Sequence, residues 1–154
     1  MSLIYIFGAQ YLFLLVTGFF VGFFLWQKKE TQKKMIKLSV FVLPLSYFLA
    51  KIAGFIFYNP RPFVSDGIKP LIYHIADNGF PSDHTLLCAT LSFIVYFFDK
   101  KIGAILIIIS LFVGASRVFV GVHHWVDIFG SVFIAGGTVF VIQMIMKRKK
   151  LKDE

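Results

Sequence analysis

The chain has 154 residues, of which 58% are hydrophobic and 16% are charged, and its formal net charge is +8. Soluble domains have about half their residues apolar and about a quarter charged, so this composition argues against a soluble protein. The basic residues lie in short clusters between apolar runs, as in cytoplasmic membrane flanks, which argues against nucleic acid as a partner. The length allows a single domain, over residues 1–154.

Five apolar segments approach or reach the length that crosses a bilayer. A hydrocarbon core of about 30 Å requires roughly 20 apolar residues in a helix. In chain order the segments are about 3–26, 36–58, 84–98, 102–120 and 124–146. The first has no basic residue ahead of it and no clear cleavage site, so we expect a retained span and not a signal peptide. The predicted fold class is all-α, a polytopic membrane bundle of about five transmembrane helices.

The basic clusters predict how this bundle is oriented. They follow the first segment, separate the third from the fourth, and follow the fifth (Lys28, Lys29, Lys33, Lys34, Lys37; Lys100, Lys101; Lys147, Arg148, Lys149, Lys150, Lys152). The positive-inside rule makes all three cytoplasmic, which places the N-terminus outside and the C-terminus in the cytoplasm. The loop 59–83 and the turn 121–123 then meet on the outer side.

The long loop 59–83 contains apolar residues at helical spacing (Ile68, Leu71, Ile72 and Ile75), with Pro70 near their start. This pattern favours a short helix lying in the membrane interface. A covering loop without a helix is the alternative.

Polar residues that a membrane should reject occur at the outer ends of several segments. Arg61 stands between two prolines that stop the preceding helix. Its guanidinium can donate two parallel hydrogen bonds to a phosphate. Lys51, near the outer end of the second segment, is either a second phosphate ligand or a lysine whose amine reaches the headgroups.

The tetrapeptide Pro81-Ser82-Asp83-His84 opens the third segment. Ser82 or Asp83 can serve as the helix N-cap. A helix N-terminus also offers free backbone N–H groups to an anion, which would then lie beside His84. Cys88, the single cysteine, lies in the apolar stretch that follows, and we expect it to be packed as a small hydrophobic residue.

The run from Ser116 to Asp127 carries the densest polar group. Arg117 lies about one turn from the end of an apolar segment, where an arginine faces either a polar cavity or the headgroups. His123 and Asp127 are four residues apart and share one helix face, so the carboxylate can fix the imidazole tautomer. Alternatively they are a helix-start aspartate and a headgroup-level histidine.

Two further histidines, His74 and His124, fit no such geometry and are expected to be interfacial. A metal site on His84, His123 and Asp127 is a competing use of these side chains. The cations expected around them would repel a divalent metal, so we expect neither a metal nor another cofactor.

Together, these patches resemble the type 2 phosphatidic acid phosphatase superfamily of membrane lipid phosphatases. That family carries Lys-x6-Arg-Pro, Pro-Ser-x-His and Ser-Arg-x5-His-x3-Asp motifs. The third motif matches in full from Ser116 to Asp127, and the second matches at Pro81–His84. In the first, Gly54 stands at the lysine position, and Lys51, three residues earlier, is the only lysine nearby.

The resemblance implies metal-independent removal of the terminal phosphate from a lipid phosphate or pyrophosphate. His123 would attack phosphorus and form a phosphohistidine, Asp127 would orient it, and His84 would protonate the leaving oxygen. The phosphoryl oxygens would be bound by Arg61, Arg117, Ser82, the backbone near Asp83, and Lys51. The protein would act in the bacterial inner membrane, in cell envelope biogenesis, with its site facing the periplasm.

The aspartate in the Pro-Ser-Asp-His motif resembles the bacitracin-resistance type of undecaprenyl pyrophosphate phosphatase, so undecaprenyl pyrophosphate is the favoured substrate. Lipid A 1-phosphatases and phosphatidylglycerophosphate phosphatases share the same frame and are the alternatives. A small transporter or channel is the rival from another class, but the middles of the first, third and fifth segments lack the charges it needs. A structural membrane subunit gives no reason for His123 and Asp127 to share a face.

Overall fold

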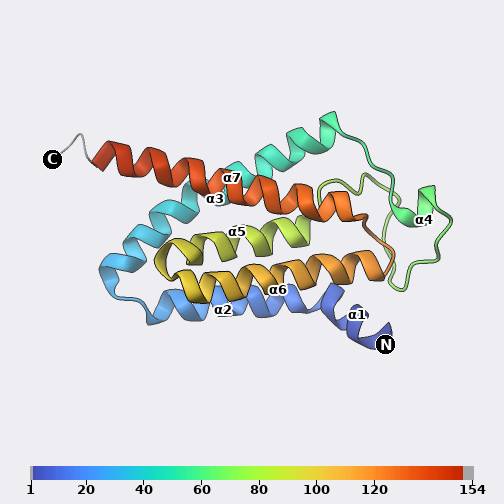
Figure 1. Ribbon diagram of the computed structural model, residues 1–154, viewed down its shortest axis with the longest axis horizontal. Coiled ribbons are helices and arrows are strands. Elements are labelled where there is room, and N and C mark those ends of the chain that lie inside the picture. The colour runs from blue at the N-terminus through green and yellow to red at the C-terminus, as the bar shows by residue number, and fades with distance from the viewer. Residues whose placement is uncertain (1, 151–154) are drawn as a thin grey trace.

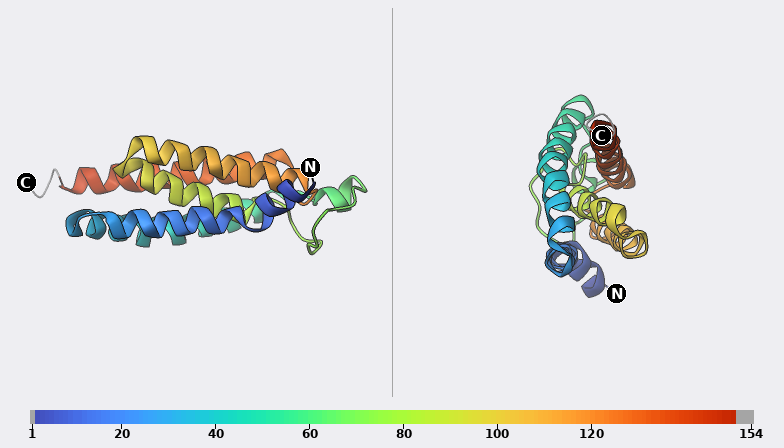
Figure 2. Two further views of the ribbon diagram at one scale, coloured as in Figure 1. Left: turned by 90° about the horizontal axis from the view of Figure 1, so that it is seen from below. Right: turned by 90° about the vertical axis from the view of Figure 1, so that its left-hand side faces the viewer.

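The computed structural model describes the backbone of residues 2–150 and the side chains of residues 2–148. Within this range the helices are α1 (Ser2–Gln10), α2 (Leu12–Trp26), α3 (Lys29–Ile56), α4 (Pro62–Ser65), α5 (Asp83–Phe98), α6 (Lys100–Phe119) and α7 (Trp125–Lys150). The long helices lie side by side in one elongated bundle (Figures 1 and 2). The all-α membrane bundle predicted from the sequence is confirmed.

Three helices, α3, α6 and α7, are long and apolar enough to cross a bilayer. The first predicted span is not one straight rod, because α1 and α2 meet at Tyr11 with a bend of 45°, and they pass the same test only as a pair. The third predicted span corresponds to α5, which has 16 residues and is shorter than the roughly 20 that a bilayer requires. The number of five spans therefore stays a prediction.

The ends of two helices differ from the predicted segments. α3 begins at Lys29 and α7 continues to Lys150, so both extend through the neighbouring basic clusters. Lysine, glutamine and glutamate are good helix formers, and the apolar segment supplies the stable helix from which they continue.

The centre of the bundle is α5, which packs against α2, α3, α6 and α7. Its inner side chains are small or medium in size, and Cys88 is fully buried as expected. Close approach to α6 depends on Gly103, where an added Cβ would lie 2.2 Å from the Tyr96 Cα. Small residues of this kind let membrane helices pack tightly. The result is a rigid central helix whose first turn lies at the site described below.

Basic residues and polar patches lie at opposite ends of the bundle. The α2–α3 and α5–α6 turns and the C-terminal end of α7 are at one end, with the three basic clusters (Figure 1). Lys152 lies outside the described residues. The loop between α3 and α5 and the turn between α6 and α7 are at the other end. All three polar patches therefore meet, as the parity of the predicted spans required.

The predicted helix over Ile68–Ile75 is wrong. The helix in this loop is instead α4, which begins at Pro62, where the missing proline N–H costs nothing. Gly67 adopts a left-handed φ of +69° and Pro70 removes a donor, so helical geometry does not continue. The segment is held by tertiary contacts, because the Leu71 N–H donates to the Val120 carbonyl at 2.9 Å. Of its apolar residues, Ile72 packs against the buried cluster of Ala9, Val120 and Val122, whereas Ile68, Leu71 and Ile75 are exposed.

Candidate active site

A cavity of about 420 Å³ opens at the polar end of the bundle. Its wall brings together six of the eight predicted site residues: Lys51, Arg61, Asp83, His84, Arg117 and His123. The other two, Ser82 and Asp127, are fully buried behind that wall. Residues far apart in the sequence, from α3 to the start of α7, thus form one site.

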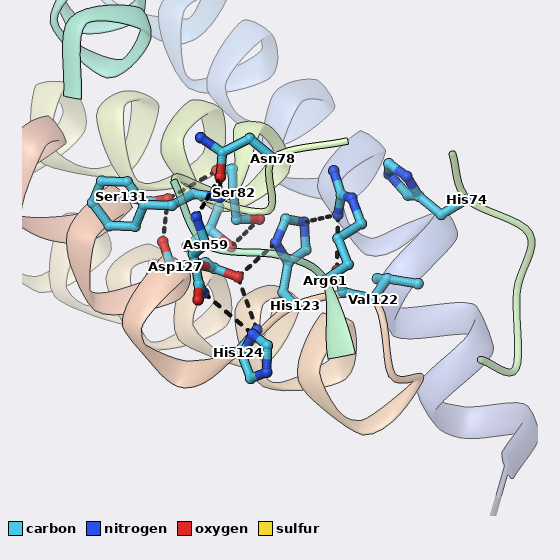
Figure 3. Close-up of polar contacts among 12 residues, drawn as sticks. Asn59, Arg61, His74, Asn78, Ser82, Val122, His123, His124, Asp127 and Ser131 are labelled. Atoms are coloured by element: carbon cyan, nitrogen blue, oxygen red, sulfur yellow. Dashed lines mark hydrogen bonds and ion pairs between the residues drawn. The ribbon is translucent and has the colours of Figure 1, made fainter. Parts of the chain in front are cut away.

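The central pair is His123 and Asp127. His123 lies in the turn before α7 and Asp127 in the first turn of that helix, so their Nδ1 and Oδ2 atoms are 3.2 Å apart (Figure 3). Asp127 Oδ2 also accepts the His124 backbone N–H at 2.8 Å. Both side chains are buried, with 3% and 0% exposed. The predicted shared face is therefore a direct contact shielded from solvent.

The tautomer of His123 follows from its other neighbour. Arg61 Nη1 lies 3.2 Å from His123 Nε2. A guanidinium can only donate, so Nε2 must accept and the ring proton must lie on Nδ1, facing Asp127. Burial lowers the pKa of His123 to about 4; Asp127 opposes this shift, and the charges of Arg117 and Arg61 add to it. At neutral pH the ring is uncharged and its Nε2 lone pair faces Arg61.

Arg61 is held on two further sides. Its Nε donates to Asp77 Oδ1 at 2.6 Å, and Nη1 donates to the Val122 carbonyl at 2.8 Å. Burial raises the pKa of Asp77, but the hydrogen bond and charge of Arg61 outweigh this and keep the pKa below its usual value. Asp77 is therefore a charged partner that fixes the guanidinium at the cavity.

Arg117 is also buried, with 4% exposed. Its Nη1 donates to the Ala9 carbonyl at 3.3 Å, next to the bend between α1 and α2. Its Nε has no hydrogen-bond partner among the described residues. Small residues allow this approach, since a Cβ at Gly8 would lie 2.2 Å from Ser116 Oγ. A buried cation with an unused donor is suited to an anion in the cavity.

The first turn of α5 forms another part of the wall. Ser82 is at the N-cap position, and its Oγ accepts the Thr85 hydroxyl at 3.1 Å. Asp83 and His84 line the cavity, and the His84 ring packs edge-on against Phe13, with ring centroids 4.8 Å apart. The start of a sixteen-residue helix, with its free N–H groups, thus lies at the cavity wall.

Lys51 reaches the site from α3. Its Nζ lies 3.6 Å from Asp83 Oδ1 and 4.7 Å from the centroid of the Tyr47 ring. The family's lysine position is occupied by Gly54, where a Cβ would lie 2.8 Å from the Phe80 carbonyl oxygen. The backbone at Phe80 therefore leaves no room for a side chain at position 54. Lys51, one turn earlier, is placed where its amine lines the same cavity.

Three residues of the site's surroundings were not singled out from the sequence. His74, expected only to be interfacial, lines the cavity with its ring centroid 6.3 Å from that of His123. Asp77 holds Arg61, and Asn59 donates to Asp127 Oδ1 at 2.8 Å. The only sequence signal was their location in the loop that joins two of the motifs. His124, also expected to be interfacial, contacts Asp66 and Asn59 outside the cavity lining.

Among the described residues, no group of three His, Cys, Asp or Glu side chains is arranged to hold a metal ion. His84, His123 and Asp127 do not form the three-ligand arrangement that was the alternative interpretation. Asp127 Oδ2 is already engaged by His123 and the His124 backbone. What the cavity offers is two buried guanidinium groups, a neutral imidazole and a second histidine.

A family comparison gives this geometry its context. The model of the PAP2 superfamily matches residues 35–151 and so includes all three motifs. The chain belongs to the PAP2 superfamily. The resemblance drawn from the motifs is therefore confirmed.

Among curated PAP2 relatives, the chain is 44% identical over 80 residues to the undecaprenyl-diphosphatase BcrC of Bacillus subtilis, covering 52% of this chain and 42% of that protein. It is 34% identical over 105 residues to the bacitracin transport permease protein BcrC of Bacillus licheniformis, covering 67% of this chain and 52% of that protein. The chain thus spans about half the length of these relatives.

Two solved structures share the fold. The Aquifex aeolicus LpxE crystal structure superposes with a TM-score of 0.75 at 21% identity, covering 92% of this chain and 86% of that one. A PAP2-type phosphatidylglycerolphosphate phosphatase from Bacillus subtilis superposes with a TM-score of 0.60 at 25% identity, covering 94% and 74%. The likeness to LpxE, at this identity, supports the arrangement of helices alone.

Proposed function

We propose that the protein is a bacterial inner-membrane lipid phosphatase that hydrolyses the terminal phosphate of a lipid pyrophosphate. The observation that carries the proposal is the buried His123–Asp127 pair, which faces a cavity containing two buried arginines. Undecaprenyl pyrophosphate is the favoured substrate. The relative with 44% identity, named as an undecaprenyl-diphosphatase, supports that choice.

In the proposed mechanism, His123 Nε2 attacks the terminal phosphorus and the bond to the bridging oxygen breaks. His84 gives its proton to the leaving oxygen, then takes a proton from the water that hydrolyses the phosphohistidine. Asp127 stabilises the positive charge that develops on the imidazole. Phosphoryl transfer mainly requires positioning and cations around the spreading negative charge, which Arg61 and Arg117 supply without a metal.

Substrate binding replaces the contact between Arg61 and His123. When phosphate oxygens enter, Arg61 Nη1 donates to them, and the Nε2 lone pair of His123 becomes available for attack. Asp77 keeps hold of the opposite edge of the guanidinium during this exchange. The backbone N–H groups near Asp83 complete the binding of the phosphoryl oxygens from the start of α5. Ser82, predicted as a further phosphate ligand, lies buried behind them with its hydroxyl bonded to Thr85.

A lipid substrate is supported by a second, largely apolar groove of about 240 Å³ between α3 and α5. It is lined by Leu43, Ser46, Tyr47, Leu86, Leu87 and Thr90, and it shares Asp83 with the phosphate cavity. A lipid chain in this groove would place its headgroup at the start of α5. Lys51, beside Asp83, is then the cation for the second phosphate of a pyrophosphate.

The decisive experiment measures phosphate release by the purified protein in detergent from undecaprenyl pyrophosphate, lipid A 1-phosphate, phosphatidylglycerophosphate and phosphatidic acid. We expect the pyrophosphate to be cleaved fastest, because a phosphate leaving group needs less protonation than an alkoxide. For the same reason, His84→Ala should impair monophosphate hydrolysis more than pyrophosphate hydrolysis. Preference for phosphatidic acid, or equal losses in His84→Ala, would contradict the pyrophosphate assignment.

The catalytic assignment is tested in the same assay. His123→Ala should abolish phosphate release, because the variant lacks the proposed nucleophile and His84 is assigned to proton transfer. Asp127→Asn should retain more activity, since the nucleophile remains. Circular dichroism and thermal unfolding serve as the folding control for both variants. Near-normal turnover in folded His123→Ala would exclude the phosphohistidine mechanism.

A further inference from the structure

The backbone of Asn59 makes two hydrogen bonds, one through its N–H and one through its carbonyl. Its N–H donates to the Asn78 side chain at 2.9 Å, and its carbonyl accepts the Gly79 N–H at 2.8 Å. Asn78 is in turn anchored to the Gly54 carbonyl at the end of α3, at 2.7 Å. The backbone of Asn59 is therefore held in place by the second half of the loop, independently of Asp127.

The Asn59 amide is directed at the carboxylate behind the nucleophile (Figure 3). Its Nδ2 lies 2.8 Å from Asp127 Oδ1, whereas His123 and the His124 backbone N–H both contact Oδ2. An ionised carboxylate only accepts, so the amide nitrogen, and not the oxygen, must face it. Asn59 thus contacts Oδ1 of Asp127, the oxygen that neither His123 nor the His124 backbone contacts.

The second hydrogen of the amide is also used. Asn59 Nδ2 lies 3.2 Å from His124 Nδ1, and His124 Nε2 lies 3.3 Å from Asp66 Oδ2. Since Nδ2 can only donate, His124 Nδ1 accepts, and its Nε2–H then donates to Asp66. The Asn59 amide therefore connects the buried His123–Asp127 pair to the more exposed His124–Asp66 pair.

We propose that Asn59 is a positioning residue for His123, acting through Asp127. By holding Oδ1, it prevents the carboxylate from rotating, so that Oδ2 stays in line with the His123 Nδ1 proton. An amide does this without adding charge, which leaves Asp127 free to stabilise the developing imidazolium. This inference rests on the proposed phosphohistidine chemistry and adds a third member to the His123–Asp127 pair.

The first test is a split between kcat and KM in Asn59→Ala. Asn59 does not line the cavity, so KM for undecaprenyl pyrophosphate should change little. We expect kcat to fall by about 10- to 100-fold, by analogy with the loss of groups that orient the histidine ligands of metals. Asp66→Asn is the matched control, because it removes the outer partner of His124 and leaves the Asn59–Asp127 contact intact. Its kcat should equal that of the parent protein.

The second test is Asn59→Asp, which keeps the shape and changes the chemistry. Two carboxyl groups at hydrogen-bond distance share a proton, so the introduced group donates to Asp127 only when it is protonated. The ratio of variant to parent kcat should therefore rise as the pH is lowered. A purely structural role for Asn59 would give a ratio that does not change with pH.

A third measurement does not depend on turnover. In protein labelled with 15N-histidine, the ring Nδ1–H signal of His123, assigned by its loss in His123→Ala, should be present in the parent and lost or shifted in Asn59→Ala. If no lipid phosphate is cleaved, the proposed function fails, and this signal alone decides the role of Asn59. If Asn59→Ala does not fold, Asn59→Asp decides it. Parent-like kcat, pH dependence and ring signal in folded variants would overturn the proposal.

Discussion

At the scale of single residues, the site is a set of polar groups that hold one another in place. Arg61 donates to His123 Nε2, and Asp77 holds Arg61. On the other edge of the imidazole, Asp127 contacts His123 Nδ1, and Asn59 in turn donates to Asp127. Each of these contacts is between 2.6 and 3.2 Å. Burial makes them effective, because the same groups at the surface would be solvated by water and would lose their fixed geometry.

The protonation of His123 is a first prediction. Its pKa of about 4 in the free protein means that it is neutral over the whole physiological range and gains a proton only as the pH falls through about 4. An unperturbed histidine gains its proton at a pH of about 6.5. Asp127→Asn removes a group that raises this pKa, so the variant should titrate at still lower pH. NMR titration of 15N-histidine protein measures both. A midpoint near 6.5 in the parent would contradict the buried, neutral nucleophile.

Asp77→Asn is a second prediction. The substitution keeps the shape of the side chain but removes the charge that fixes Arg61 Nε. Hydrogen bonds to charged groups contribute about 1.5–3 kcal/mol, so KM should rise by about 10- to 100-fold. Asp66→Asn, on the same loop but paired with His124 outside the cavity lining, is the control and should leave KM unchanged. Equal KM values for all three proteins would show that Arg61 needs no fixed partner.

At the scale of secondary-structure elements, the end of α3 and the start of α5 are set by close backbone contact. Gly54 lies against the Phe80 carbonyl, and Asn78 bonds to the Gly54 carbonyl from the same loop. This contact holds the start of the loop, which includes Asn59 and Arg61, close to the first turn of α5. It also leaves no room for a lysine side chain at position 54, where the first motif of the family has one, and Lys51 lies about one helical turn earlier.

Gly54→Ala is the third prediction. A Cβ there would lie 2.8 Å from a backbone oxygen that cannot move without shifting the start of α5. We expect a loss of phosphatase activity of about 10-fold or more, since a displacement of about 1 Å at a catalytic site can cost about 100-fold. Gly22→Ala is the control, because nothing lies within 4 Å of that position. Parent-like activity in Gly54→Ala would mean that the contact is not required.

The elements also show which parts of the protein are predictable from sequence. Hydropathy located every long helix, and motif spacing located His123, Asp127 and Arg117, because both signals are local. Asn59, His74 and Asp77 were missed, since their loop is held by hydrogen bonds between residues far apart in the sequence, such as those from Arg61 to Asp77 and from Asn59 to Asn78. The spacing of Ile68–Ile75 was misleading, because the segment is not helical and only Ile72 packs against the buried cluster that includes Val120 and Val122.

At the scale of the whole molecule, the two ends of the bundle differ in their content of basic residues. Most described lysines lie in the three basic clusters, at the end of the bundle with the α2–α3 and α5–α6 turns, whereas the cavity, lined by Lys51 among others, lies at the opposite end (Figure 1). By the positive-inside rule, we propose that the basic end is cytoplasmic and the cavity faces the periplasm. The pyrophosphate would then be hydrolysed on the outer leaflet, with the chain 1–154 acting as one domain.

Cysteine labelling in intact cells is the fourth prediction. A membrane-impermeant maleimide should label Ser65→Cys, in α4, and should not label Thr31→Cys, at the start of α3. The native Cys88 is fully buried, so the parent protein gives the background level. Permeabilised cells provide the control that Thr31→Cys can react. The reverse pattern would place the cavity in the cytoplasm and exclude outer-leaflet lipids as substrates.

The bend at Tyr11 has a consequence for how the bilayer acts on the enzyme. The Ala9 carbonyl beside it accepts a hydrogen bond from Arg117, which couples the tilt of α1 to the position of a buried arginine that lines the cavity. Helices tilt when the hydrocarbon thickness changes. A change in the tilt of α1 would therefore displace the Ala9 carbonyl and, with it, the Arg117 guanidinium. Turnover should therefore vary with acyl-chain length in reconstituted vesicles, beyond any effect in detergent. A membrane of the wrong thickness would act as an inhibitor without occupying the active site.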